Sequence, residues 1–154
     1  THCETDRVFA RGAVVSMPVD GSAPPAASLI MDGNKNLYST TVSGGAYNQG
    51  TVFKLAPDGT LTTVHSFGGT DGADPVSGVI ADEVGYLYGV TAQGGAHNFG
   101  TVFKLAPDGT HTVLHSFRRK KDGTSPVGDL IMGQRGHALW HSGGRRAPLG
   151  RYRV

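Results

Sequence analysis

Apolar and β-branched residues occur in short runs along the chain, separated by polar breaks that are rich in glycine. In the first half these runs cover residues 29–31, 37–41, 51–55 and 61–67. The run at 51–55, Thr-Val-Phe-Lys-Leu, is rich in residues that favour strands and is too short for a stable helix. The breaks carry turn residues, such as the Pro-Asp-Gly at 57–59. The pattern predicts four short strands.

The same pattern recurs about 50 residues later, as expected for a tandem repeat. Residues 29–67 align with 79–117 without a gap, and "GTVFKLAPDGT" stands at both 50–60 and 100–110. Four strands in a unit of this length are typical of a propeller blade, whereas the coils of a β-solenoid, the alternative, are usually shorter. We therefore expect an all-β fold with β-propeller-like four-stranded blades, two full repeats and partial ones, which together form an incomplete propeller.

The repeat divides the chain into four segments. Residues 1–28 echo the end of a repeat and are interpreted as a degenerate or partial preceding blade. Residues 29–78 form repeat 1 and residues 79–129 form repeat 2. Residues 130–154 start a third repeat, whose pattern collapses after Met132 into a polar tail rich in glycine and arginine, for which we expect disorder.

Codons suggest why the pattern collapses. Trp140 must be TGG and the next codon, for His141, begins with C, so a frame shifted forward by one nucleotide reads glycine at 140, where Gly89 predicts one. The last four residues, Arg-Tyr-Arg-Val, can likewise be encoded so that the shifted frame reads Gly-Thr-Val-Phe, in register with residues 100–103. We hypothesise that the tail is an out-of-frame third blade. The alternative is a genuine basic tail that meets solvent or an anionic surface.

The order and spacing of several motifs give a more specific indication. "LYG", "GTVFKLAPDGT" and "LHSF" stand in sequence, with Gly-Gly pairs between them, from about residue 29 to 132. This arrangement resembles the tandem GloVer-type repeat of bacterial surface and secreted proteins. The resemblance implies propeller blades in an extracellular or surface-anchored protein, and it implies no enzymatic activity.

Composition narrows the function classes. The net charge is only +2, which gives no reason to expect nucleic acid as a partner, and no apolar run reaches the length of a membrane span. Cys3 is the single cysteine, so the chain has no internal disulfide and no cysteine metal site. The sequence begins without Met and shows no signal peptide, so the expected secreted or cell-surface location rests on the resemblance.

The candidate chemical residues all have simpler structural interpretations. His65 and His115 occupy matching places in different repeats, with no third metal ligand in the motif, and we expect hydrogen bonds to the scaffold. Asp58 and Asp108 fit turns better than calcium sites. The loop at 71–75 has two carboxylates, but its counterpart keeps one. We therefore expect no catalytic residue, no metal site and no cofactor.

Residues that differ at matched places are where a repeat can acquire a function of its own. Leu61 aligns with His111, and in the longest loop Tyr47 aligns with His97 and Gln49 with Phe99. Because loops on rigid scaffolds often carry recognition, we expect ligand binding first in that loop. Its candidate residues are Tyr47, Asn48 and Gln49 in repeat 1 and His97, Asn98 and Phe99 in repeat 2.

The leading functional interpretation is a non-enzymatic extracellular β-propeller repeat module that binds a glycan or a surface protein, or has a structural role. The alternatives are a fragment of a propeller enzyme, such as a lyase or hydrolase, and a non-functional truncated gene product. Because two blades expose apolar faces, we also expect that other blades or other copies of the chain cover them.

Overall fold

The computed structural model describes the backbone of residues 7–10, 13–16, 29–119, 124–126, 130–133, 137–140, 142–143 and 150–153. Every regular element in these ranges is a β-strand, so none of them contains a helix long and apolar enough to cross a membrane. Side chains are described for residues 29–119, 130–132 and 139. The all-β prediction is confirmed for this part of the chain.

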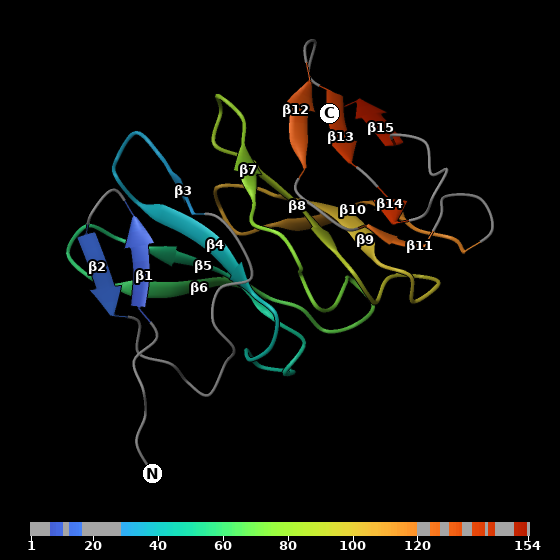
Figure 1. Ribbon diagram of the computed structural model, residues 1–154, viewed down its shortest axis with the longest axis horizontal. Helices are drawn as coiled ribbons and strands as arrows, with labels where there is room; N and C mark the ends of the chain where they lie inside the picture. Colours follow the sequence, from blue (N-terminus) through green and yellow to red (C-terminus); the bar gives the residue numbers. More distant parts are fainter. Residues whose placement is uncertain are drawn as a thin grey trace.

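The two full repeats each form a four-stranded antiparallel sheet (Figure 1). The strands of repeat 1 are β3 (Ile30–Met31), β4 (Leu37–Thr41), β5 (Thr51–Leu55) and β6 (Leu61–Ser66). Those of repeat 2 are β7 (Ile80–Ala81), β8 (Leu87–Thr91), β9 (Thr101–Leu105) and β10 (His111–Ser116). Strands are adjacent in chain order within each sheet, and the described sheets do not close into a ring.

Identical turns connect the third and fourth strand of each sheet. In repeat 1, Gly59 N–H donates to the Ala56 carbonyl, and Thr60 N–H donates to Asp58 Oδ1 at 2.9 Å. Asp108 accepts the same bond from Thr110 N–H, also at 2.9 Å. The prediction that these aspartates are turn residues is confirmed.

A β-bulge interrupts the pairing of the last two strands in both repeats. On β6 the register shifts between Val52 and Phe53, so that Val52 pairs with His65, Phe53 pairs with Thr63, and Val64 is the extra residue. A bulge of this kind breaks the alternation of side chains between the two faces of a strand. Val64 and His65 therefore both turn toward the face that carries Val52. Leu114 and His115 have the same arrangement on β10.

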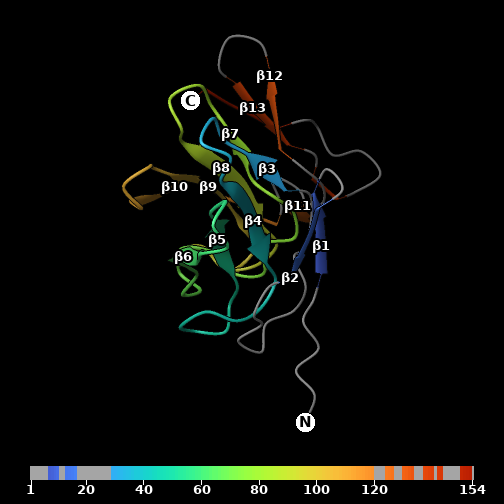
Figure 2. The same cartoon turned by 90° about the vertical axis from the view of Figure 1, so that its left-hand side faces the viewer.

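The apolar core lies between the repeats. One cluster, here called the junction cluster, joins repeat 1 to repeat 2 and consists of Val52, Phe67, Val79, Leu87, Phe103 and Leu105. A second cluster on the far face of repeat 2 contains Tyr88, Val90, Val102, Phe117 and Leu130. Leu130 matches Val79 in the alignment, so the second cluster copies the first at the start of the third repeat. Figure 2 views the two stacked sheets from the side of repeat 1.

Short sheets flank the two repeats. Near the N-terminus β1 (Arg7–Ala10) and β2 (Ala13–Ser16) form an antiparallel hairpin. Near the C-terminus three strands form an antiparallel sheet in the order β12-β13-β15, and β14 pairs with β11. The bounds of these strands are Thr124–Pro126 for β11, Ile131–Gly133 for β12, His137–Trp140 for β13, Ser142–Gly143 for β14 and Gly150–Arg153 for β15.

The C-terminal sheet differs from the disorder that we expected for the tail. We expected no regular structure after Met132, whereas the described pieces of that segment are strands. Their order is that of the first three strands of a repeat, and β12 starts where the alignment places the counterpart of β7. The shifted reading frame is a statement about DNA, and it stays a prediction.

Candidate functional site

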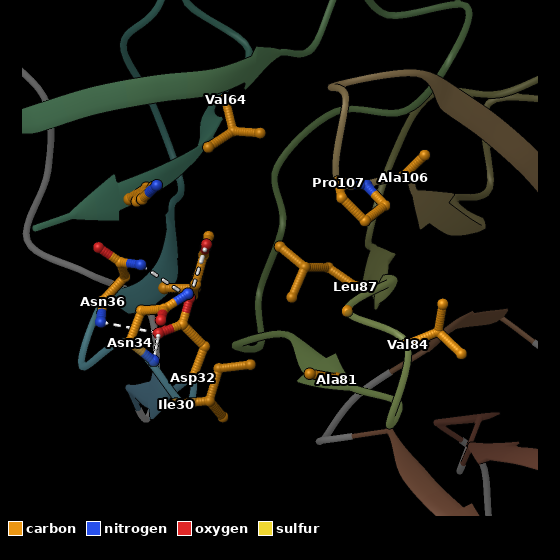
Figure 3. A pocket seen from close by; sticks show the side chains of 13 residues that line it. Ile30, Asp32, Asn34, Asn36, Val64, Ala81, Val84, Leu87, Ala106 and Pro107 are labelled. Atoms are coloured by element: carbon orange, nitrogen blue, oxygen red, sulfur yellow. Dashed lines mark hydrogen bonds between the residues drawn. The ribbon is translucent and has the colours of Figure 1, made fainter.

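A pocket of about 330 Å³ lies at the junction of the two repeats. Repeat 1 supplies its polar wall, which consists of Asp32, Asn34, Asn36, Tyr38 and Lys54. Repeat 2 supplies an apolar wall of Ala81, Val84, Leu87, Ala106 and Pro107. Figure 3 shows the polar side chains of the β3–β4 turn on one side and Leu87 and Pro107 across from them. The pocket therefore joins residues that are far apart in the sequence.

Asp32 organises the polar wall. Its Oδ1 accepts hydrogen bonds from the backbone N–H groups of Asn34 and Asn36, both at 2.9 Å. Its Oδ2 accepts from Asn36 Nδ2 at 2.8 Å and from the Tyr38 hydroxyl at 3.2 Å. Partial burial by itself would raise the pKa of Asp32, but these hydrogen bonds outweigh it and lower the pKa below its ordinary value. The carboxylate is thus ionised at neutral pH and fixes the orientation of its neighbours.

Repeat 2 keeps the aspartate and loses the polar groups around it. Asp82 accepts from the backbone of Val84 and Tyr86 and from the Tyr88 hydroxyl, just as Asp32 does in its own turn. However, Val84 and Tyr86 replace Asn34 and Asn36. The matching surface of repeat 2 therefore lacks the two side-chain amides that line the pocket in repeat 1.

The lysine that both repeats carry at the matching place shows the consequence of this difference. In repeat 2 the ammonium of Lys104 lies 4.0 Å from the centroid of the Tyr86 ring, a cation–π contact. In repeat 1 the matching aromatic ring is absent, and the side chain of Lys54 lines the pocket without a hydrogen bond or ion pair to the described residues. The polar wall therefore offers an available cation beside its amides.

The junction also holds a second group of polar residues, His65, Asp71 and His111, which we call the histidine cluster. His65 Nε2 lies 2.8 Å from Asp71 Oδ2, and Asp71 Oδ1 accepts from Gly68 N–H at 2.8 Å. The rings of His65 and His111 stack with a centroid distance of 4.2 Å and an interplanar angle of 9°. The cluster thus spans both repeats.

His111 is the unusual member of this cluster. Its Nε2 is buried and has no hydrogen-bond partner among the described residues. Burial lowers the pKa of His111 to about 4, with a further lowering from His65 and a partial offset from Asp71. At neutral pH the ring is therefore uncharged, and Phe67 and Phe103 surround it at centroid distances of 5.8 and 5.5 Å.

The histidine that lies next to His65 is not one that the sequence analysis considered for a metal site. We considered His65 together with His115, and the two lie in different junctions, as expected. The hydrogen bond to Asp71 agrees with a scaffold role for His65. The residue that approaches His65 is instead His111, which the alignment had marked only by its mismatch with Leu61. That mismatch was the available signal.

The loops predicted to bind a ligand are largely occupied by their own structure. Asn48 Oδ1 accepts from Gly44 N–H at 3.0 Å, and Asn98 Oδ1 accepts from Gly94 N–H at the same distance. The Gln49 carbonyl accepts from Asp74 N–H, and Phe99 packs against the second cluster. Tyr47, 65% exposed, and the exposed His97 present their side chains to solvent. Ligand binding at these loops stays a prediction.

The remaining candidates fit their structural interpretations. In the loop at 71–75, Asp74 accepts from Gln93 Nε2 while Asp71 faces His65, so the two carboxylates serve different partners. Gly45 has φ +79, and an added Cβ would lie 2.6 Å from Thr51 Cγ2, which is the close approach expected of the Gly-Gly pair. Cys3 lies outside the described residues.

The profile of the Gloeobacter/Verrucomicrobia repeat family matches residues 9–142. The chain belongs to this family. The match covers both full repeats and extends into the flanking segments, so the resemblance seen in the sequence is confirmed. A comparison with curated proteins finds no match. Membership of the family indicates a repeat module. The pocket and the histidine cluster are described here from the residues of this chain.

Proposed function

We propose that this chain is a non-enzymatic repeat module of a secreted or surface protein, with propeller-type blades, and that it binds carbohydrate in the pocket between its repeats. The observation that carries the proposal is the pocket's two-sided lining. Asn34, Asn36 and Lys54 offer hydrogen-bond donors and acceptors on one wall, and Leu87 and Pro107 offer an apolar surface on the other. Sugars carry hydroxyl groups at their edges, which can form hydrogen bonds with the polar wall. They carry C–H groups on their ring faces, which can pack against the apolar wall.

The dimensions of the pocket support a small ligand. A volume of about 330 Å³ lies at the lower end of the range for ligand sites and suits one or two sugar rings. The Asp32 hydrogen bonds hold Asn36 and Tyr38 in place, so the polar wall is already ordered before binding. Such preorganisation reduces the entropy lost on binding.

The lining supports binding more than catalysis. Glycoside hydrolysis commonly needs two carboxyl groups, one acting as the acid and one as the base or nucleophile. Of the residues that line this pocket, Asp32 is the one carboxylate, and it accepts four hydrogen bonds that lower its pKa. A carboxylate in that state is a poor proton donor at neutral pH.

A glycan array probed with the labelled chain tests this proposal, followed by calorimetry with the best binder. The decisive variant is the pair Asn34→Val and Asn36→Tyr, which installs the residues that repeat 2 carries at the matching places. We expect at least a tenfold loss of affinity. Tyr47→His, which installs the residue of the matching loop, is the control and should leave the affinity unchanged. The reverse result would place the ligand in the loop, and an array without binders would overturn the proposal.

A further inference from the structure

The histidine cluster has the composition of a metal site. One ligand atom from each of His65, Asp71 and His111 lies within 4.8 Å of the other two. Two imidazoles and a carboxylate form a common protein donor set for zinc with one position left open. Nitrogen-rich sets of this kind favour zinc and its neighbours over calcium and magnesium, which prefer oxygen ligands.

The fold brings these three residues together only at the junction. The bulge on β6 lets His65 and Val64 both turn toward repeat 2. In a strand with strict alternation, these two neighbouring side chains would point to opposite faces of the sheet. Asp71 lies in the segment that connects β6 to β7, and its Oδ1 accepts a hydrogen bond from Gly68 N–H. His111 begins β10 of repeat 2 and stacks on His65. Strand β6, the segment after it and strand β10 thus contribute one ligand each.

His111 is prepared to act as a ligand. Its buried Nε2 has no hydrogen-bond partner among the described residues, and its ring lies against the rings of Phe67 and Phe103. A neutral imidazole with an unused lone pair is the form that coordinates a metal. A leucine occupies this place in repeat 1, so a histidine is not needed for folding of the repeat.

We propose that His65, Asp71 and His111 bind one Zn²⁺ ion between the two repeats, with the fourth position left to water. Tetrahedral zinc holds its ligand atoms about 3.4 Å apart, so the cluster must contract around the ion. The rings of His65 and His111 are nearly parallel, and one ion cannot lie in both ring planes. Binding therefore turns His111 out of the stack, and zinc takes the place of the hydrogen bond between His65 and Asp71.

The experiment is a calorimetric titration of the tag-free full chain with ZnCl2, with CaCl2 as a second titrant. We expect one zinc per chain with a micromolar or tighter Kd, and no comparable calcium binding. His111→Leu, which copies Leu61 of repeat 1, should weaken zinc binding at least tenfold. His97→Tyr removes an exposed histidine in favour of its repeat 1 counterpart, Tyr47, and should bind zinc as the wild type does.

Two further readings keep the test decisive. The cobalt-substituted wild-type chain should show the intense visible absorption of a tetrahedral site, and Asp71→Asn should reduce that absorption even if His111→Leu folds poorly. Zinc binding that survives both His111→Leu and Asp71→Asn would overturn the proposal, as would a wild-type chain that binds no zinc. Loss of zinc binding in His97→Tyr alone would place the ion elsewhere.

Discussion

The two full repeats bury the same framework and differ where each meets its neighbour. Val52 and Phe67 in the junction cluster correspond to Val102 and Phe117 in the second cluster. The positions that differ include Asn36 against Tyr86 and Leu61 against His111. Stacked repeats are held by nearest-neighbour interfaces, so the shared residues stabilise the stack. Of the residues that differ from their counterparts, Asn34 and Asn36 line the pocket and His111 belongs to the histidine cluster.

Phe103→Ala should have the largest effect on this comparison. Phe103 is fully buried in the junction cluster, and its ring lies 5.2 Å from that of Phe67. Loss of a buried aromatic side chain leaves a cavity and typically costs about 3–5 kcal/mol of unfolding free energy. Urea denaturation followed by circular dichroism measures it. A loss below about 1 kcal/mol would mean that the junction is not the main core of the chain.

Gly89→Ser should have the second-largest effect on the free energy of unfolding. The substitution places in repeat 2 the residue that repeat 1 carries at the matching position. Ser39 occupies the matching place in repeat 1, yet a Cβ at Gly89 would lie 2.8 Å from Phe103 Cε1. Overpacking of this kind costs about 1–3 kcal/mol. Gly33→Ser is the control, because a Cβ there meets nothing within 4 Å. Equal unfolding midpoints for the two variants would show that the repeats are interchangeable at this position.

The third prediction concerns pH and the mismatch between Leu61 and His111. The pKa of His111 is lowered to about 4 in the folded chain from an ordinary value of about 6.5, so the unfolded chain binds a proton first as pH falls. The stabilisation is present above pH 6.5 and is lost as the pH falls from there toward 4. Allowing for solvent screening of a partly exposed ring, we expect a loss of about 1–2 kcal/mol.

Denaturation in buffer with EDTA at pH 7 and pH 4.5 measures this loss without bound metal. His111→Leu carries the residue of repeat 1 and should lose less stability over the same interval. The groups that face His111 are His65 and Asp71, and both remain in the variant. Parallel pH profiles for the two proteins would contradict the assignment of the buried neutral ring.

The smallest effect is expected where the repeats are identical. Asp58→Ala and Asp108→Ala each remove one hydrogen bond to the backbone N–H of the threonine two residues later. Because both carboxylates are exposed and make the same bond, we expect small and equal decreases in Tm by scanning calorimetry. Clearly unequal decreases would show that the turns have different roles in the two repeats.

The strands and turns could be predicted because their signals are local. The run at 51–55, the Asp58 turn and the alignment of the repeats depend on residues near one another in sequence, and the observed strands follow them closely. The junction could not be predicted in the same way. Its pocket joins Asn36 to Pro107, and its cluster needs a bulge at Val64 that strict alternation along a strand does not foresee. The signal in the sequence for the histidine cluster was the mismatch between His111 and Leu61.

Nitrogen–proton correlation spectra of the labelled chain, titrated with the carbohydrate selected on the array, test the central claim most directly. We predict that the largest shifts fall on the backbone and side-chain amides of Asn34 and Asn36 and on Ala106 across the pocket. Shifts confined to Tyr47 and His97 would contradict the account and return the ligand to the long loops.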